Sequence, residues 1–321
     1  MPEQLDASEV VALTRDETAH LHTEARRIAE PGESSAELAE RAAGLAAALP
    51  SSVLRALHRF RNTGSQHNAL LVRGLLPEMP DLEPTPETTI PATAGEACRA
   101  GALTLLAVLE MLGEAFTFAS LYEGRLVQHV LPVPGQESAQ SSEGSEHLTW
   151  HVEDAFTERR CDVFGLLCLR GAKEADTLIA PARTVELPSW AEQVLRQPRF
   201  VVAPDSAHGA DQDHDLPPTP VLSGPAADPE LCFDAVYQRP ADPDDHEAAE
   251  AWAELARAVD RAAVGHVLSP GELLLADNRR VAHARTVLHP RYDGRDRWLL
   301  RAMACASARA HRRRGAVRAV A

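Results

Sequence analysis

Two histidines and one glutamate carry the most specific chemistry in this 321-residue sequence. His151 and Glu153 are separated by a single residue, and His283 lies far downstream. Two imidazoles and one carboxylate can hold a ferrous ion on one face and leave the opposite face open for oxygen and a co-substrate. We therefore predict that these three side chains are the metal ligands and the catalytic residues of an iron-dependent oxygenase.

The secondary structure around each His-x-Glu triplet decides whether it can bind a metal ion. His22 and Glu24 form the first triplet, on a predicted helix, where residues i and i+2 point about 200° apart. His151 and Glu153 lie at the end of a predicted strand, where residues i and i+2 project to the same side. The second triplet is therefore the candidate site, and the first is a solvated helix face.

The third ligand must come from a distant part of the chain. His283 follows a predicted strand that ends at Asp277, so we expect it in a turn at the mouth of a barrel. An arginine, Arg297, opens the next apolar run, where a buried charge needs an anion to meet. Its paired hydrogen bonds would suit the far carboxylate of a keto-diacid. On chemistry alone, other histidines are alternatives: His129, His147, His266 and His289.

The predicted ligand set defines a reaction class and leaves its outcome open. Three protein ligands leave three positions on an octahedral ion, two for a 2-oxoacid and one for dioxygen. The metal performs the difficult step, while the protein supplies placement and electrostatics. Hydroxylation of an sp³ carbon, desaturation and ring closure remain possible, as does a non-catalytic jelly-roll that only binds a small molecule.

The hydrophobic pattern changes near residue 116. Residues 1–115 are predicted to be mostly helical, because two capping boxes, Thr14 with Glu17 and Ser34 with Glu37, precede apolar residues at helical spacing. Beyond them, short apolar runs alternate with turn residues, which is typical of a sandwich or barrel. The predicted strands are residues 126–133, 148–152, 163–169, 177–179, 200–202, 220–222, 231–237, 272–276 and 298–304.

These patterns predict a mainly β fold with flanking helices around a double-stranded β-helix (jelly-roll) core. We expect one domain over residues 1–321, with the core at residues 116–305 and a lid insert at about 205–265. Residues 306–321 form a basic tail, which we expect to be disordered.

Composition limits the partners and the location. The net charge is −15, from 47 acidic and 32 basic residues, which disfavours nucleic acid. No apolar run reaches the roughly 18 residues that span a bilayer, and the first residues lack a signal core. Five cysteines without CxxC spacing indicate reduced thiols. We expect a cytoplasmic protein, monomeric or homodimeric, with a small-molecule substrate and neither a nucleic-acid nor a membrane partner.

Several stretches resemble the clavaminate synthase-like branch of the Fe(II)/2-oxoglutarate oxygenases, which includes arginine and asparagine β-hydroxylases. The similarity spans roughly residues 70–305. The matching stretches are LVQHVLPVPGQE (126–137), WHVEDAF (150–156), GLLCLRG (165–171), PVLSG (220–224) and DNRRVAHARTVLHPRYDGRDRWLLR (277–301).

This resemblance implies a jelly-roll enzyme that uses Fe(II), 2-oxoglutarate and O₂ to hydroxylate Cβ or Cγ of a free L-amino acid or a close derivative. The setting would be bacterial specialised metabolism, including antibiotic biosynthesis. His151, Glu153 and His283 would bind the iron. Arg297 would bind the distal carboxylate of 2-oxoglutarate with help from Thr177.

The resemblance also suggests residues for the substrate. Glu153 would accept a hydrogen bond from the substrate amine, and Arg301 would meet its carboxylate. Gln128 and Ser141 would border the pocket, on the substrate side and the co-substrate side respectively, although each could instead satisfy local backbone. Relatives that act on arginine carry several acids in the lid, whereas residues 231–238 here hold only Asp234, and Tyr237 would occupy the recognition position.

Overall fold

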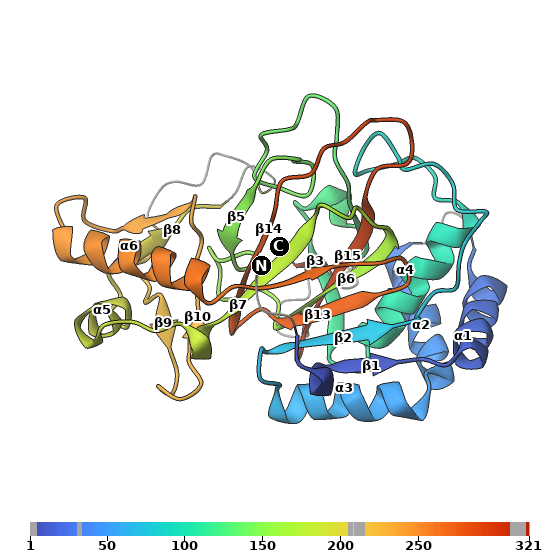
Figure 1. The fold of residues 1–321 in the computed structure, drawn as a ribbon, viewed down its shortest axis with the longest axis horizontal. Coiled ribbons are helices and arrows are strands. Elements are labelled where there is room, and N and C mark those ends of the chain that lie inside the picture. Colours follow the sequence, from blue (N-terminus) through green and yellow to red (C-terminus); the bar gives the residue numbers. More distant parts are fainter. Residues whose placement is uncertain (1–4, 31–33, 205–207, 209–215, 309–318, 321) are drawn as a thin grey trace.

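Two β-sheets form the centre of the computed structural model, which describes residues 5–30, 34–204, 208, 216–308 and 319–320 (Figure 1). The larger sheet has the strand order β1-β2-β13-β6-β15-β3-β16, and β4 also pairs with β15. Its strands are β1 (Val10–Ala12), β2 (Ala69–Arg73), β3 (Glu114–Phe118), β4 (Gln128–Val130), β6 (Val163–Arg170), β13 (Leu273–Asp277), β15 (Trp298–Cys305) and β16 (Ala319–Val320).

The smaller sheet contains the predicted metal ligands. Its order is β12-β7-β14-β5, and every pairing in it is antiparallel. The strands are β5 (Leu148–His151), β7 (Asp176–Pro181), β12 (Val264–Val267) and β14 (Val281–Arg285). Two short ribbons lie outside the main sheets: β8 (Phe200–Val202) with β11 (Gln238–Pro240), and β9 (Leu222–Ser223) with β10 (Glu230–Leu231).

The alternation of side chains along each strand assigns residues to layers. On β13, Leu273 and Leu275 pack against the helices, whereas Leu274 and Ala276 share an apolar cluster with Ile179 of the smaller sheet. The two sheets therefore pack face to face, with an interior between them. On β14 the same alternation turns His283 and Arg285 away from the outer cluster that contains Ala282 and Ala284.

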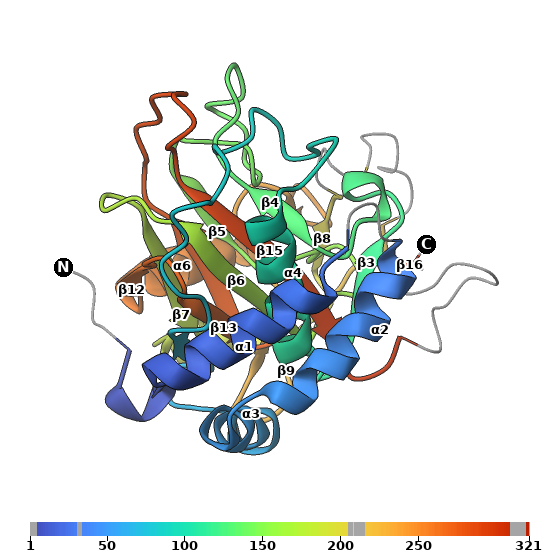
Figure 2. The ribbon, with the colours of Figure 1, turned by 90° about the vertical axis from the view of Figure 1, so that its right-hand side faces the viewer.

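Helices cover both outer faces. Figure 1 shows α5 (Ser189–Leu195) and α6 (His246–Arg261) beside the smaller sheet, and four helices on the side of the larger sheet. These four helices are α1 (Arg15–Ile28), α2 (Ser35–Leu45), α3 (Ser51–Thr63) and α4 (Glu96–Leu109). Figure 2 shows α4 between the larger sheet and the helices α1 and α2. None of the helices in the described ranges is both long and apolar enough to cross a membrane.

The capping boxes that the sequence predicts are present at the starts of α1 and α2. Thr14 and Ser34 each accept a hydrogen bond from the backbone of the glutamate three residues on, and both capping boxes are complete. α4 is buried on almost all sides, as its uniformly apolar sequence predicts. Glu24 pairs with Arg27 at the surface of α1, whereas Nδ1 of His22 is buried, so these two side chains do not form a shared ion site.

Three local predictions differ from the structure. His283 lies within the strand β14, not in a turn; the turn is the preceding residues 278–280. Of the predicted strand 231–237, only its first residue is in a strand, because Asp234 accepts hydrogen bonds from the N–H groups of Val236 and Tyr237 and so bends the chain. Ala319–Val320 forms β16 beside β3, so these two residues of the predicted tail are ordered by strand pairing.

Parts of two predicted segments lie outside the described residues: 205–207 and 209–215 of the lid insert, and 309–318 and 321 of the tail.

Replacing Leu105 of α4 by alanine should destabilise the protein by about 2–5 kcal/mol, because this fully buried side chain fills the interface with the larger sheet. The fit there is close, since a Cβ added at Gly165 of β6 would lie 3.0 Å from Leu105 Cδ1. Urea unfolding measures the effect. Leu54→Ala on α3, at a partly buried position, is the matched control and should cost less; equal losses would contradict this assignment of the interface.

Candidate active site

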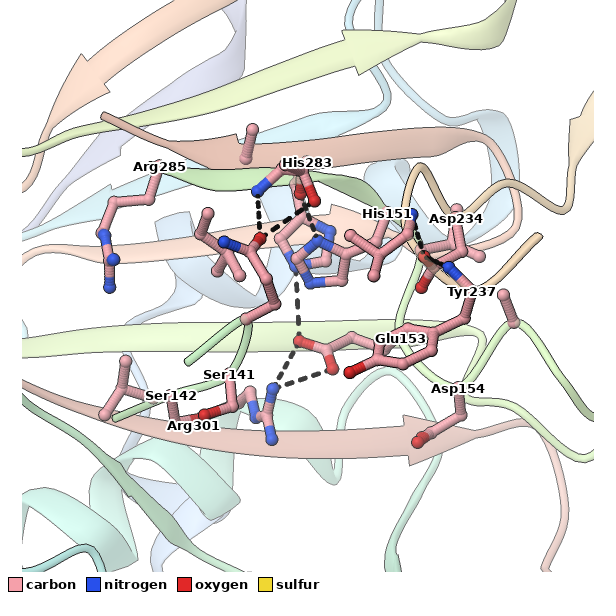
Figure 3. A pocket seen from close by; sticks show the side chains of 18 of the residues that line it. Ser141, Ser142, His151, Glu153, Asp154, Asp234, Tyr237, His283, Arg285 and Arg301 are labelled. Atoms are coloured by element: carbon pink, nitrogen blue, oxygen red, sulfur yellow. Dashed lines mark hydrogen bonds and ion pairs between the residues drawn. The ribbon is translucent and has the colours of Figure 1, made fainter. Parts of the chain in front are cut away.

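The three predicted metal ligands converge on one point. One ligand atom from each of His151, Glu153 and His283 lies within 4.8 Å of the others. Strand pairing causes this, because His283 of β14 is directly opposite His151 of β5. The ring centroids of these histidines are 4.1 Å apart, and His283 Nε2 is 3.3 Å from Glu153 Oε1. Figure 3 shows the two imidazoles and the carboxylate directed toward one another.

Hydrogen bonds and charges prepare these side chains for a cation. His151 Nδ1 lies 2.8 Å from the carbonyl of Thr149; donation to this oxygen leaves Nε2 with a lone pair for a metal ion. Burial, with the neighbouring His151, lowers the pKa of His283 to about 4, so its imidazole is neutral near pH 7. Burial alone would raise the pKa of Glu153, but Arg301 and His283 outweigh it and hold that pKa well below its ordinary value.

The site therefore offers the unprotonated imidazole of His283 and the carboxylate of Glu153, which are the protonation states that divalent metal ions require, beside Nε2 of His151. In addition, His283 Nδ1 is buried without a hydrogen-bond partner among the described residues, so packing alone does not account for this imidazole. These donors fit a ferrous ion.

The side chain of Asn278 holds the loop that carries Glu153. Its Oδ1 accepts from the N–H of Glu153 at 2.8 Å, and its Nδ2 donates to the carbonyls of Glu153 and Cys161 at 3.0 and 3.1 Å. Asn278 is fully buried in the turn between β13 and β14. This one amide therefore joins the loop after β5 to the start of β14, the strand that carries His283.

Two buried guanidinium groups form the cationic end of the cavity. Arg297 donates from Nη2 to Thr177 Oγ1 at 3.2 Å, and Arg285 of β14 is directly opposite Thr177 of β7. Within the described part of the chain, neither guanidinium pairs with a carboxylate. Burial lowers the pKa of Arg297 to about 10; burial and the Arg297 charge lower that of Arg285 to about 10. Uncompensated charges of this kind fit a dianionic ligand.

A third arginine, Arg301, lies next to the metal ligands. Its Nη1 is 2.8 Å from each oxygen of Glu153, and its Nε and Nη2 donate to Gln128 Oε1 at 2.9 and 2.7 Å. Both Glu153 oxygens lie at the same distance from Nη1, so one Nη1–H is shared between them in a three-centre bond. Of the five N–H groups of a guanidinium, one then remains on each terminal nitrogen. The two remaining N–H groups can grip a carboxylate end-on.

One pocket contains most of the residues predicted for the site. The three metal ligands line it together with Arg297, Thr177, Ser141, Arg301, Asp234 and Tyr237. The exception is Gln128, which does not line the pocket. It lies behind Arg301 with its amide committed to that guanidinium, so its predicted contact with substrate is not supported.

Sequence reasoning missed three residues of this region: Asn278, Arg285 and Asp154, the last of which also lines the pocket. Arg285 lies two residues after His283, so strand periodicity would have placed it on the same face. Asp154 directly follows Glu153 and has a positive φ of 54°. No local pattern indicates the hydrogen bonds of Asn278 to the distant residues 153 and 161.

Comparison with known proteins identifies the family. A family model described as "Taurine catabolism dioxygenase TauD, TfdA family" matches residues 56–303. The chain belongs to the TauD/TfdA family.

Curated relatives and solved structures of this dioxygenase family agree with the match. The chain is 38% identical over 271 residues to L-asparagine oxygenase of Streptomyces coelicolor, covering 83% of this chain and 79% of that one. It is 33% identical to L-lysine 3-hydroxylase of Catenulispora acidiphila (80% and 72% covered) and 34% identical to clavaminate synthase 2 of Streptomyces clavuligerus (80% and 80%).

The structural matches extend over nearly the whole chain. A structure of asparagine oxygenase in complex with Fe(II), 2S,3S-3-hydroxyasparagine and succinate has a TM-score of 0.89 and 34% identity, covering 97% of this chain and 99% of that one. A structure of the non-heme iron oxygenase OrfP with Fe and alpha-ketoglutaric acid has a TM-score of 0.88 and 29% identity, with the same coverage. The predicted jelly-roll fold, oxygenase class, iron and 2-oxoglutarate are thereby confirmed.

Replacing Asn278 by aspartate should weaken metal binding about 10- to 100-fold, as is typical when a group that orients metal ligands is changed. The variant keeps an acceptor for the N–H of Glu153 but turns a carboxylate oxygen toward two carbonyls. Equilibrium titration with Mn(II) measures the effect, with Asn62→Asp on the exposed end of α3 as control. Unchanged metal affinity together with a lower melting temperature would mean that Asn278 only stabilises the fold.

Proposed function

We propose that this oxygenase hydroxylates Cβ or Cγ of a free L-amino acid or a close derivative, with Fe(II), 2-oxoglutarate and O₂. The observation that carries the proposal is the position of Arg301 and Glu153 at the metal site. A guanidinium with two free N–H groups lies 2.8 Å from a carboxylate that is itself a candidate metal ligand. This pair of charges is complementary to the carboxylate and ammonium of an amino acid. The names of the relatives, which include an asparagine oxygenase and a lysine 3-hydroxylase, support it.

His151, Glu153 and His283 would hold the Fe(II). With 2-oxoglutarate and oxygen, this iron supplies the oxidising chemistry that attacks an unactivated C–H bond and releases succinate and carbon dioxide. The protein contributes position: Asn278 fixes Glu153, Thr149 fixes the ring of His151, and the lowered pKa of His283 keeps that imidazole unprotonated.

Arg297 and Thr177 would bind the distal carboxylate of 2-oxoglutarate, with Arg285 adding a second positive charge. Along β14, Arg285 is two positions beyond His283, which corresponds to about 7 Å of strand. A five-carbon diacid has a similar length, so it can reach from the metal ligands to the guanidinium groups. Ser141, which lines the same pocket, is our candidate for a further polar contact to the co-substrate.

Arg301 would bind the substrate carboxylate, and Glu153 would accept a hydrogen bond from its amine. Gln128 would position Arg301 without touching the substrate. Asp234 and Tyr237 also line the pocket, where they would contact the substrate side chain. With both ends of the amino-acid group fixed, the carbon to be oxidised is held over the metal ligands.

Desaturation or ring closure is the second candidate outcome, since the same candidate metal ligands would support it. The product mass separates the outcomes, by the gain of one oxygen or the loss of two hydrogens.

We further propose a single-domain cytoplasmic protein, monomeric or homodimeric, without a nucleic-acid partner. The net charge of −15 disfavours a nucleic-acid partner. The five cysteines are all free thiols, which is typical of a reducing compartment. One pocket is lined by residues between Leu121 and Arg301, which supports a single domain. The setting of bacterial specialised metabolism is supported by the names of the relatives.

Incubation with Fe(II), 2-oxoglutarate, oxygen and a panel of L-amino acids should give succinate and a product heavier by one oxygen atom, as measured by mass spectrometry. His151→Ala should reduce turnover to background, because it removes a metal ligand. His147→Ala, at an exposed position outside the pocket, is the matched control. The proposed function would be refuted if the wild-type enzyme bound metal and 2-oxoglutarate but oxidised no amino acid in the panel.

Arg297→Gln should raise the KM for 2-oxoglutarate about 100-fold or more and change kcat less. Two charge-assisted hydrogen bonds contribute at least about 3 kcal/mol, and each 1.4 kcal/mol is a factor of ten. Steady-state kinetics with varied 2-oxoglutarate measure this, and Arg295→Gln on the exposed loop nearby is the control. If both variants keep the wild-type KM, Arg297 does not bind the co-substrate.

A further inference from the structure

The residues 232–237, which we call the wall segment, connect β10 to β11 and run along the edge of β5 that does not pair with β14. The N–H of Ala235 donates to the carbonyl of Trp150 at 2.9 Å, and Asp234 forms an antiparallel bridge with His151. β5 is therefore paired on both sides, with β14 and with the wall segment. This pairing places the wall segment beside the strand that carries a candidate metal ligand.

The wall segment forms one side of the pocket through Asp234 and Tyr237. Figure 3 shows both residues on the same side of the metal ligands, opposite Arg285. Oδ1 of Asp234 accepts hydrogen bonds from the N–H groups of Val236 and Tyr237 at 2.8 and 2.7 Å, which closes the segment into a turn. The directions of the two pocket side chains therefore depend on how this turn is fixed to the rest of the protein.

A buried amide, Gln238, fixes the turn at both ends. Its Nε2 donates to the carbonyl of Cys232 at 2.9 Å, and its Oε1 accepts from the N–H of Asp234 at 3.4 Å. The second lone pair of Oε1 accepts from Nε1 of Trp252 at 3.2 Å. Gln238 is 5% exposed and does not line the pocket. One carboxamide thus connects the wall segment to a residue of α6.

The helix α6 is a fixed support for this hydrogen bond. Its Leu255 is fully buried in the outer core cluster, and its N-cap residue Asp245 pairs with Arg199 at 2.7 Å. Trp252 lies in the middle of this helix and is half-buried. A phenyl ring could pack in the same place, so what the indole adds is one N–H, and that N–H is directed at Gln238.

We propose that Gln238 and Trp252 are positioning residues, which act through the wall segment to set the side of the pocket that contacts the substrate side chain. This inference rests on the proposed function and adds to it two residues that do not line the pocket. Neither residue touches the substrate or the co-substrate. Loss of their hydrogen bond should therefore weaken binding of the amino acid and leave binding of 2-oxoglutarate, at the guanidinium end of the pocket, unchanged.

Trp252→Phe tests the proposal, because it removes the N–H and keeps an aromatic ring on α6. It should raise the KM for the amino acid that the panel identifies about two- to ten-fold, as the loss of one hydrogen bond does. The kcat and the KM for 2-oxoglutarate should stay near their wild-type values, because the lost interaction stabilises ground state and transition state equally. Trp190→Phe on α5, whose ring is 40% exposed, is the matched control. An unchanged KM for the amino acid, or an equal rise for 2-oxoglutarate, would overturn the proposal.

A double-mutant cycle determines whether the two residues act through one hydrogen bond. Gln238→Met removes both polar atoms at a similar side-chain length and should raise the KM for the amino acid more than Trp252→Phe does. Adding Trp252→Phe to Gln238→Met should change this KM no further. Independent effects that multiply in the double variant would refute the shared role. Should Gln238→Met fail to fold, Trp252→Phe still decides.

Hydrogen exchange of the backbone amides gives a readout that needs no substrate. In Trp252→Phe the wall segment should exchange about two-fold or more faster, while the residues 281–285 of β14 keep the wild-type rate. Unchanged exchange in the wall segment refutes the positioning role, whether or not an amino acid is oxidised. Faster exchange together with a failed amino-acid panel would support the fixing of the wall segment by this pair and remove the proposed function, so the two failures are distinguishable.

Discussion

The metal site depends on the hydrogen bonds between the side chain of Asn278 and the backbone of Glu153. The two histidines need no such help, because they lie opposite each other on paired strands and the ladder sets their spacing. Glu153 lies two residues beyond the end of β5, where no ladder continues, so its direction would otherwise vary with the loop. The fully buried amide supplies both a donor and an acceptor to this residue. These hydrogen bonds thereby fix Glu153, the third ligand, relative to the turn before β14.

Around this point the pocket contains buried charges in two different states. Glu153 and Arg301 compensate each other, which keeps the carboxylate ionised and the guanidinium fixed. Arg285 and Arg297 have no carboxylate partner in the described ranges, and their pKa values are lowered mainly by burial. Burying unpaired cations disfavours folding, and binding of a dianion reverses this cost. The protein gives up stability at this end of the pocket, and a bound dianion, such as the proposed 2-oxoglutarate, would restore it.

The sequence predicted those parts of the structure that follow from local periodicity. The assignment of His151 and Glu153 to one face needed only the two-residue repeat of a strand, and the helix starts at Thr14 and Ser34 needed only the capping pattern. β14 was not predicted as a strand, because alternating small residues around His283 give a weak apolar signal. The roles of Asn278 and Gln128 were also not predicted, since each depends on partners more than a hundred residues away. Spacing within a segment says nothing about such contacts.

The position of Gln128 behind Arg301 has a consequence for the proposed substrate site. A carboxamide oxygen that accepts from both Nε and Nη2 fixes the plane of the Arg301 guanidinium, while Glu153 fixes its rotation from the other edge. The N–H groups left over then point in one direction only, which a flexible lysine ammonium could not reproduce. In the proposed complex, the orientation of the substrate carboxylate would therefore originate in Gln128, which does not line the pocket. Because Glu153 belongs to both the candidate ligand set and this anchor, one shared carboxylate would position the metal ion and the amino-acid group.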